Sequence, residues 1–128
     1  MTDDETATLH RYLTAWGDGD VMTVLGSYHE RLELRWPGSH RLSGTQSGRD
    51  AAVTALAELQ AATGRVLAEV RSITPADGFA DVEVVERWTV DGSTIDLPRL
   101  LRFGVRDGLI AWCSVTEHQP ELVDRILG

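Results

Sequence analysis

The sequence has no lysine and only one cysteine. All 12 of its basic residues are arginines, which excludes Schiff-base chemistry and a lysine nucleophile. Because Cys113 is the single cysteine, no disulfide can form within the chain, and no spacing of Cys and His resembles a zinc site. We therefore expect a fold that is held together by packing alone, with no metal and no cofactor.

Long apolar runs and basic patches are also missing. No segment approaches the apolar length of a membrane span, and the N-terminus MTDDETATLH is acidic where a signal peptide would be basic. We therefore expect a cytoplasmic protein without a membrane partner. The net charge of -8 and the scattered arginines oppose nucleic-acid phosphates, so no nucleic-acid partner is expected.

The remaining composition is that of an ordinary globular protein. Hydrophobic residues make up 42% of the chain and charged residues 25%. A chain of 128 residues is long enough for one hydrophobic core and too short for two. We therefore expect a single domain over residues 1–128.

The first half of the chain predicts three helices. Apolar positions at helical spacing predict the first helix over 5–16, ended by Gly17-Asp18-Gly19. Asp20 is expected to cap a short second helix that reaches His29-Glu30 and carries Tyr28 on its apolar face. A variant capping box at 47–50 predicts a third helix over 51–63, closed by Gly64.

The second half of the chain predicts strands. Four runs over 65–74, 79–90, 94–105 and 109–118 are bounded by the hairpin signals Asp77-Gly78, Asp91-Gly92 and Asp107-Gly108. Pro98 indicates a bulge or an edge position inside the third run. A brief helix over 120–127 is expected to close the chain. This plan is α+β, with the helices on one face of a curved antiparallel sheet that can enclose a cavity.

The hairpin turns also predict a strand register. With two-residue turns, Val84 lies opposite Arg99, and Arg99 opposite Thr116. Glu86 and His118 then lie diagonal to Arg99 on the helix-covered face, and Glu117 points outward. Because buried charges must be paired, the cluster is either a structural ion pair or the polar floor of a binding site. Arg87 and Asp96 are expected to face each other on the outer side.

Four stretches together resemble a known family. They are HRYLTAWGDGD, the strand that ends in Trp36-Pro37-Gly38, LSGTQSGRDAAV and LLRFGVRDGLIAW. Their order and spacing resemble the SnoaL-like and ketosteroid-isomerase-like branch of the nuclear-transport-factor-2-like superfamily. The resemblance implies a cone-shaped barrel of three N-terminal helices on a curved, mostly antiparallel sheet around a deep apolar pocket, and a homodimer through the outer sheet face. It implies functions that range from isomerases, cyclases, dehydratases and epoxide hydrolases to pockets without known chemistry.

The resemblance also suggests roles for single residues. Tyr12 matches the tyrosine that donates to the dienolate oxygen in ketosteroid isomerases, and Arg99 stands where they carry a protonated aspartic acid. Trp36 replaces their proton-shuttling aspartate, and an indole cannot accept a proton. Epoxide hydrolases of the superfamily need an Asp–Arg–Asp set, but only Arg87 has a match. A cyclase needs a carboxylate on the later strands, where Glu117 is the nearest.

Two hypotheses follow for function. In the first, the protein is a cofactor-independent isomerase or cyclase acting on an apolar, ketone-like substrate. Tyr12 and Arg99 would hold the enolate oxygen, Glu86 would orient Arg99, and His118 would move the proton. In the second, the same pocket is a non-catalytic binding site or a scaffold. Residues expected to contact the small apolar ligand are Trp16, Trp36, His40, Trp88, Leu97, Leu101, Phe103, Trp112 and Thr116, whereas Cys113 is expected only to pack.

Overall fold

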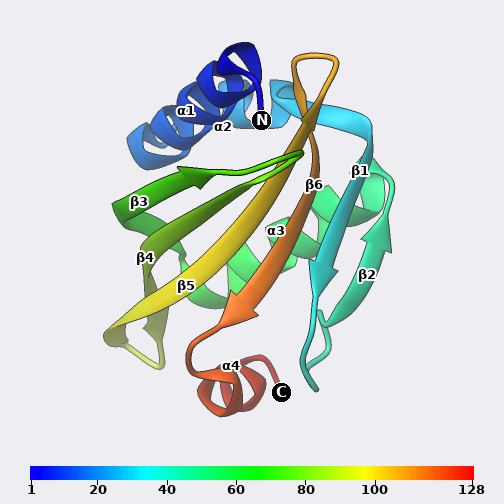
Figure 1. Ribbon diagram of the computed structural model, residues 1–128. Coiled ribbons are helices and arrows are strands. Elements are labelled where there is room, and N and C mark those ends of the chain that lie inside the picture. Colours follow the sequence, from blue (N-terminus) through cyan, green and yellow to red (C-terminus); the bar gives the residue numbers. More distant parts are fainter.

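The computed structural model describes residues 1–128 as helices packed on one curved sheet (Figure 1). The elements are α1 (Asp3–Asp18), α2 (Val21–Gly26), β1 (Tyr28–Trp36), β2 (Gly44–Ser47), α3 (Arg49–Thr63), β3 (Val66–Pro75), β4 (Ala80–Val90), β5 (Ser93–Arg106), β6 (Leu109–Glu117) and α4 (Pro120–Leu127). The strand order is β2-β1-β6-β5-β4-β3, with only β1 and β6 parallel. The predicted α+β class and mostly antiparallel sheet are confirmed. The six-stranded sheet is curved and open, and the helices pack against it.

The helices lie on one face and at the two ends of the sheet. In Figure 1, α3 lies behind the strands, α1 and α2 lie at one end, and α4 lies at the opposite end. Leu9 and Leu13 of α1 and Leu59 of α3 are almost completely buried in the core. None of the four helices is long and apolar enough to span a membrane.

The predicted first helix is confirmed, and the second is shorter than expected. A capping box starts α1, in which Thr2 Oγ1 accepts from the Glu5 amide at 3.1 Å and Glu5 Oε1 accepts from the Thr2 amide at 2.9 Å. Asp20 caps α2 as predicted, but α2 ends at Gly26. Tyr28 instead opens β1 opposite Ile110 of β6, where its side chain is buried.

The third and fourth helices have the predicted extents within two residues. Gly64 ends α3 in the left-handed conformation, with φ of 56°. The predicted capping box at 47–50 was wrong. Ser47 belongs to β2, where it pairs with Glu33 of β1, and the N-cap of α3 is Gly48, which has no side chain to cap the helix.

The predicted hairpins of the sheet are confirmed. Both residues of Asp91-Gly92 and of Asp107-Gly108 have positive φ, as two-residue primed turns require. Pro98 causes no bulge and pairs with Val85 in an unbroken register. It lies one residue beyond the last pair of β5 with β6, so β5 has a single partner strand there and the missing N–H is tolerated.

A bulge in β6 overturns part of the predicted register. Val105 pairs with Ile110 as the turn requires, but Gly104 then pairs with Trp112, so Ala111 is an extra residue. Every later pair is therefore shifted by one position, and Arg99 lies opposite Glu117 instead of Thr116. The indole of Trp112 crosses Gly104 on the outer face, where a Cβ on Gly104 would lie 1.9 Å from Nε1 of Trp112. Only glycine fits this position without a rearrangement.

Candidate functional site

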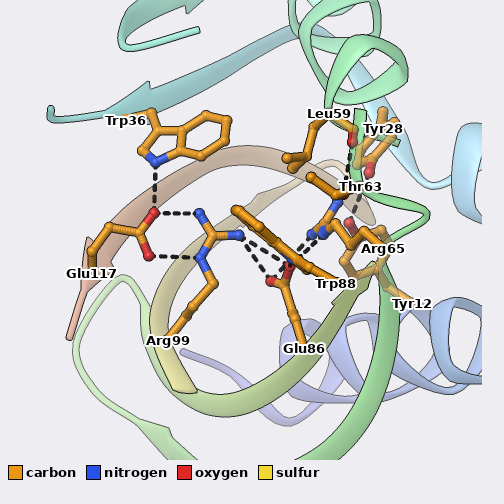
Figure 2. Close-up of polar contacts among 10 residues, drawn as sticks. All are labelled: Tyr12, Tyr28, Trp36, Leu59, Thr63, Arg65, Glu86, Trp88, Arg99 and Glu117. Atoms are coloured by element: carbon orange, nitrogen blue, oxygen red, sulfur yellow. Dashed lines mark hydrogen bonds and ion pairs between the residues drawn. The ribbon is translucent and has the colours of Figure 1, made fainter. Parts of the chain in front are cut away.

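A row of paired charged side chains lies on the inner face of the curved sheet, with Arg99 at its centre (Figure 2). Arg99 is 2% exposed, and its guanidinium contacts carboxylates on both neighbouring strands. Arg99 Nη1 donates to both oxygens of Glu86 at 3.1 and 3.0 Å. Arg99 Nε and Nη2 donate to the two oxygens of Glu117 at 2.8 and 2.7 Å. This bidentate clamp fixes the guanidinium in one orientation.

Further donors extend the row at both ends. Arg65 Nε donates to Glu86 Oε1 at 2.6 Å, and Trp88 Nε1 donates to the same oxygen at 3.0 Å. At the other end, Trp36 Nε1 donates to Glu117 Oε2 at 2.8 Å. The row thus runs from Trp36 through Glu117, Arg99 and Glu86 to Arg65 (Figure 2).

The charges in the row cancel, and this determines the protonation of its members. Burial alone would raise the pKa of Glu86, but the guanidinium groups of Arg65 and Arg99 outweigh burial and lower that pKa to about 2. Burial alone would lower the pKa of Arg99, but Glu86 and Glu117 together raise it above its usual value. With two arginines and two glutamates, the positive and negative charges of the row balance.

A mostly apolar cavity lies beside this row. Its volume is about 30 Å³. In this shape it admits a small group, and a ligand with several rings would need the wall to move. The wall comes from helices α1 and α3, strands β1, β5 and β6, and Arg65, which precedes β3. It consists of Tyr12, Trp16, Tyr28, Leu32, Leu34, Trp36, Leu56, Leu59, Arg65, Arg99, Leu101, Phe103, Cys113 and Val115.

Two tyrosine hydroxyls in the cavity wall form a polar pair that has no hydrogen bond to the charged row. The hydroxyl oxygens of Tyr12 and Tyr28 are 2.7 Å apart, so one donates to the other. The second hydroxyl keeps its own proton for another acceptor. Burial raises the pKa of both phenols, most strongly that of Tyr12, so both stay protonated at neutral pH. The edge of Phe103 packs on the Tyr12 ring, with centroids 5.6 Å apart.

The structure brings together part of the set that the sequence predicted. Tyr12, Trp16, Trp36, Arg99, Leu101 and Phe103 line the cavity. Glu86 contacts Arg99 as expected but does not reach the cavity wall. Trp88 and Leu97, which were also predicted to contact a ligand, are buried but do not line the cavity.

Three further predicted site residues, all of which follow Ala111 in the chain, lie outside the cavity because of the bulge at Ala111. Side chains alternate between sheet faces, so a shift of one residue exchanges the faces of every residue after it in β6. Trp112 and Thr116 therefore lie on the outer face, and His118 is exposed beyond the end of β6. The imidazole of His118 does not line the cavity, so the structure gives no support to the predicted proton transfer.

The same shift turns Glu117 inward, whereas the predicted register had it pointing outward. It also places Cys113 on the inner face. Glu117 has a side chain that is 4% exposed and bonded to Arg99. Cys113 lines the cavity, and burial raises the pKa of its thiol to about 12. The thiol therefore stays protonated, which agrees with a packing role.

Sequence reasoning also missed Arg65 and Tyr28. Arg65 directly follows the helix-ending Gly64, and Tyr28 was assigned to a helix instead of a strand. The one usable signal was that each is a large polar residue next to an apolar run. His40, which was predicted to contact a ligand, is buried against Trp36 and does not line the cavity. No cluster of three or more His, Cys, Asp or Glu side chains could hold a metal ion.

Comparisons with known proteins place the chain in a family. The model of the SnoaL-like domain matches residues 9–113, so the chain belongs to the SnoaL-like family. It also has the fold that the structural comparisons describe as NTF2-like. Among curated proteins, no sequence matches significantly.

Solved structures share the fold at low sequence identity. An NTF2-like protein of unknown function from Burkholderia pseudomallei is 16% identical with a TM-score of 0.82, and the match covers 98% of each chain. A candidate polyketide cyclase from Xanthomonas campestris is 20% identical with a TM-score of 0.78, covering 96% of each chain. TerC, co-crystallised with polyporic acid, is 18% identical with a TM-score of 0.81, covering 98% of this chain and 100% of TerC. These likenesses show the fold alone.

Proposed function

We propose that the cavity binds a small, neutral, largely apolar molecule through one acceptor oxygen, which the hydroxyl pair of Tyr12 and Tyr28 holds. The observation that carries this proposal is the 2.7 Å pair of hydroxyls in an otherwise apolar wall. One hydroxyl of such a pair always has a proton to donate, because each phenol has one donor and can accept from the other. An acceptor oxygen is the matching ligand group.

The charged row supports a neutral ligand with acceptor oxygens. Both carboxylates of the row are occupied by arginine and indole donors. Arg65 has donors left, because only its Nε and Nη2 contact Glu86. A ligand that donates hydrogen bonds finds no unoccupied carboxylate, and a charged ligand would upset the balance of the row. A carbonyl compound satisfies both conditions.

Carbonyl polarisation is the chemistry that such a cavity supports, and cyclase-type catalysis is therefore the second candidate. A hydroxyl that donates to a carbonyl oxygen makes the carbonyl carbon more electrophilic. The candidate polyketide cyclase among the structural neighbours favours this direction. Isomerisation has less support, because no carboxylate or imidazole lines the cavity and burial raises the pKa of the Cys113 thiol to about 12.

The proposal predicts that a bicyclic ketone such as 1-tetralone binds, with the cavity wall moving to admit its two rings, and that the two phenols contribute to its affinity. Binding to the native state alone raises stability by about 2.7 kcal/mol at a hundredfold excess over Kd. Removing both hydroxyls in Tyr12→Phe/Tyr28→Phe is expected to weaken binding about tenfold, the value of one hydrogen bond. Isothermal calorimetry on the wild type and the double variant checks this.

The matched control is Trp112→Phe, which changes an aromatic residue on the outer sheet face. It should leave the affinity for 1-tetralone unchanged. Each single Phe variant should lose less affinity than the double variant, because the remaining hydroxyl still has a proton to donate. Equal affinities of the wild type and the double variant would refute the role of the pair.

We further propose that the protein is a cytoplasmic homodimer that associates through the outer sheet face. Figure 1 shows this face without a covering helix. Leu100 lies on it between Glu83 and Thr116, and its side chain is half-buried. Leu100→Glu is expected to convert a dimer at micromolar concentration into a monomer in analytical ultracentrifugation, because it buries an unpaired charge at the interface. A wild type that sediments as a monomer would contradict this.

A further inference from the structure

His40 carries the one buried side-chain polar atom without a hydrogen-bond partner. The residue lies in the loop over 37–43, between β1 and β2, and is 6% exposed. Its Nδ1 accepts from the backbone amide of Leu42 at 3.1 Å, whereas Nε2 has no partner. Since Nδ1 accepts, it carries no proton, and the neutral ring has its proton on Nε2. A buried polar atom without a partner needs a physical explanation.

The position of the ring links His40 to the cavity wall. Its centroid lies 4.5 Å from that of the Trp36 indole at an angle of 67°. Trp36 lines the cavity and donates to Glu117 at 2.8 Å. His40 therefore packs directly on a residue of the cavity wall, and a change at His40 reaches the cavity through the Trp36 side chain.

A second proton has only one place to go on this ring. Because Nε2 already carries a proton, protonation must occur at Nδ1, where the Leu42 N–H already points. Two N–H groups would then face each other, so the cation cannot keep the bond that holds the loop. Protonation of His40 and the closed loop thus exclude each other.

The surrounding charges do not reverse this exclusion. The charged groups that act on His40 are Asp124 from α4, Glu117 from β6, Arg99 from β5 and Arg41 from its own loop. The two carboxylates favour the cation and the two arginines oppose it. Burial is the strongest effect and lowers the pKa of His40 below the usual value for histidine. Asp124 Oδ1 is also engaged, since it accepts from the Ser39 amide at 2.9 Å.

We propose that the loop over 37–43 is an acid-sensitive latch on the cavity wall, which opens when His40 takes up a proton. The sign follows from linkage: the closed loop holds a neutral histidine, so closure is most favourable above the histidine pKa of about 6.5 and weakens as pH falls below it. Opening removes the support of Trp36. If the cavity binds a ligand as proposed above, the affinity for that ligand falls with the same pH dependence.

Hydrogen exchange of the Leu42 amide tests the latch without any ligand, so failure of the latch and failure of the proposed function are distinguishable. The exchange rate, divided by the intrinsic rate at each pH, should rise roughly tenfold per pH unit below about 6.5. His40→Asn should abolish this rise, because the asparagine carbonyl can accept from the Leu42 amide and cannot be protonated. His118→Asn, which removes an exposed histidine, should leave the rise intact.

Two results would overturn the latch. One is a normalised exchange rate at Leu42 that does not change between pH 7 and 5.5 in the wild type. The other is a rise that persists in His40→Asn. If that variant does not fold, the imidazole NMR signals of His40 in the wild type decide: the latch requires the Nε2–H tautomer at pH 7 and protonation only together with loop opening.

Discussion

Replacing Arg99 by leucine is expected to lower the free energy of unfolding by about 3 to 5 kcal/mol. The guanidinium is buried between Glu86 and Glu117 and makes four hydrogen bonds to them, two to each carboxylate. Removing it leaves two buried carboxylates and a single arginine, Arg65, which contacts Glu86. Glu117 then has no cationic partner. Urea unfolding of the two proteins at pH 7 measures the difference.

Two comparisons make this test specific to burial. Arg102→Leu removes an arginine with similar geometry, at 2.7 Å from Asp81, but its side chain is 45% exposed. It should cost less than about 1 kcal/mol. Replacing the whole trio in Glu86→Leu/Arg99→Met/Glu117→Leu should recover much of the loss, since apolar residues can substitute for a buried ion network. Equal losses for Arg99→Leu and Arg102→Leu would contradict a buried, structural row.

This expectation changes how Arg99 variants are interpreted. Loss of ligand binding in Arg99→Leu would follow from instability as readily as from a lost contact with the ligand. The tyrosine pair is the better place to test recognition, because its hydroxyls contact only each other. Phenylalanine at either position keeps the aromatic packing of the wall.

Acid is expected to remove about 3 kcal/mol of stability between pH 4.5 and pH 2 through Glu86 alone. Its pKa falls from an ordinary 4.5 to about 2 on folding, so the unfolded chain takes up a proton before the folded one does. The contribution is fully present above pH 4.5 and is lost as pH falls through about 2. Unfolding free energies measured by urea across this range should show the slope.

Glu86→Gln tests the origin of that slope. The variant should be less stable at pH 7, since Arg65 and Arg99 lose a charged partner, and its stability should fall much less between pH 4.5 and 2. Asp96→Asn is the matched control, because Asp96 is paired with Arg87 on the exposed face. Its slope should stay close to that of the wild type. An unchanged slope in Glu86→Gln would show that other carboxylates dominate acid unfolding.

Local patterns in the sequence predicted most of the fold. The periodicity of α1 and α3, the stops at Gly19 and Gly64, and the Asp-Gly hairpins are short-range signals whose physics lies within a few residues. The parallel pairing of β1 with β6 joins residues about 80 positions apart and has no such local signal. For this reason Tyr28 was placed in a helix.

The candidate site was predicted only in part, and one residue explains most of the difference. Tyr12, Trp36 and Arg99 follow from spacing and family resemblance, and all three line the cavity. The faces of Cys113, Glu117 and His118 depend on Ala111, which is an ordinary strand residue in sequence. A bulge there follows from the fit of Trp112 over Gly104, which is a contact between strands.

The central claim is that the hydroxyl pair of Tyr12 and Tyr28 holds an acceptor oxygen of a neutral ligand. The infrared carbonyl stretch of bound 1-tetralone tests it most directly, because a hydrogen bond to the oxygen lowers the frequency of the band. We expect the carbonyl band of 1-tetralone to have a lower frequency when bound to the wild type than in an apolar solvent. In Tyr12→Phe/Tyr28→Phe the frequency should return toward the solvent value. No saturable binding, or the same band position in the two proteins, would contradict it.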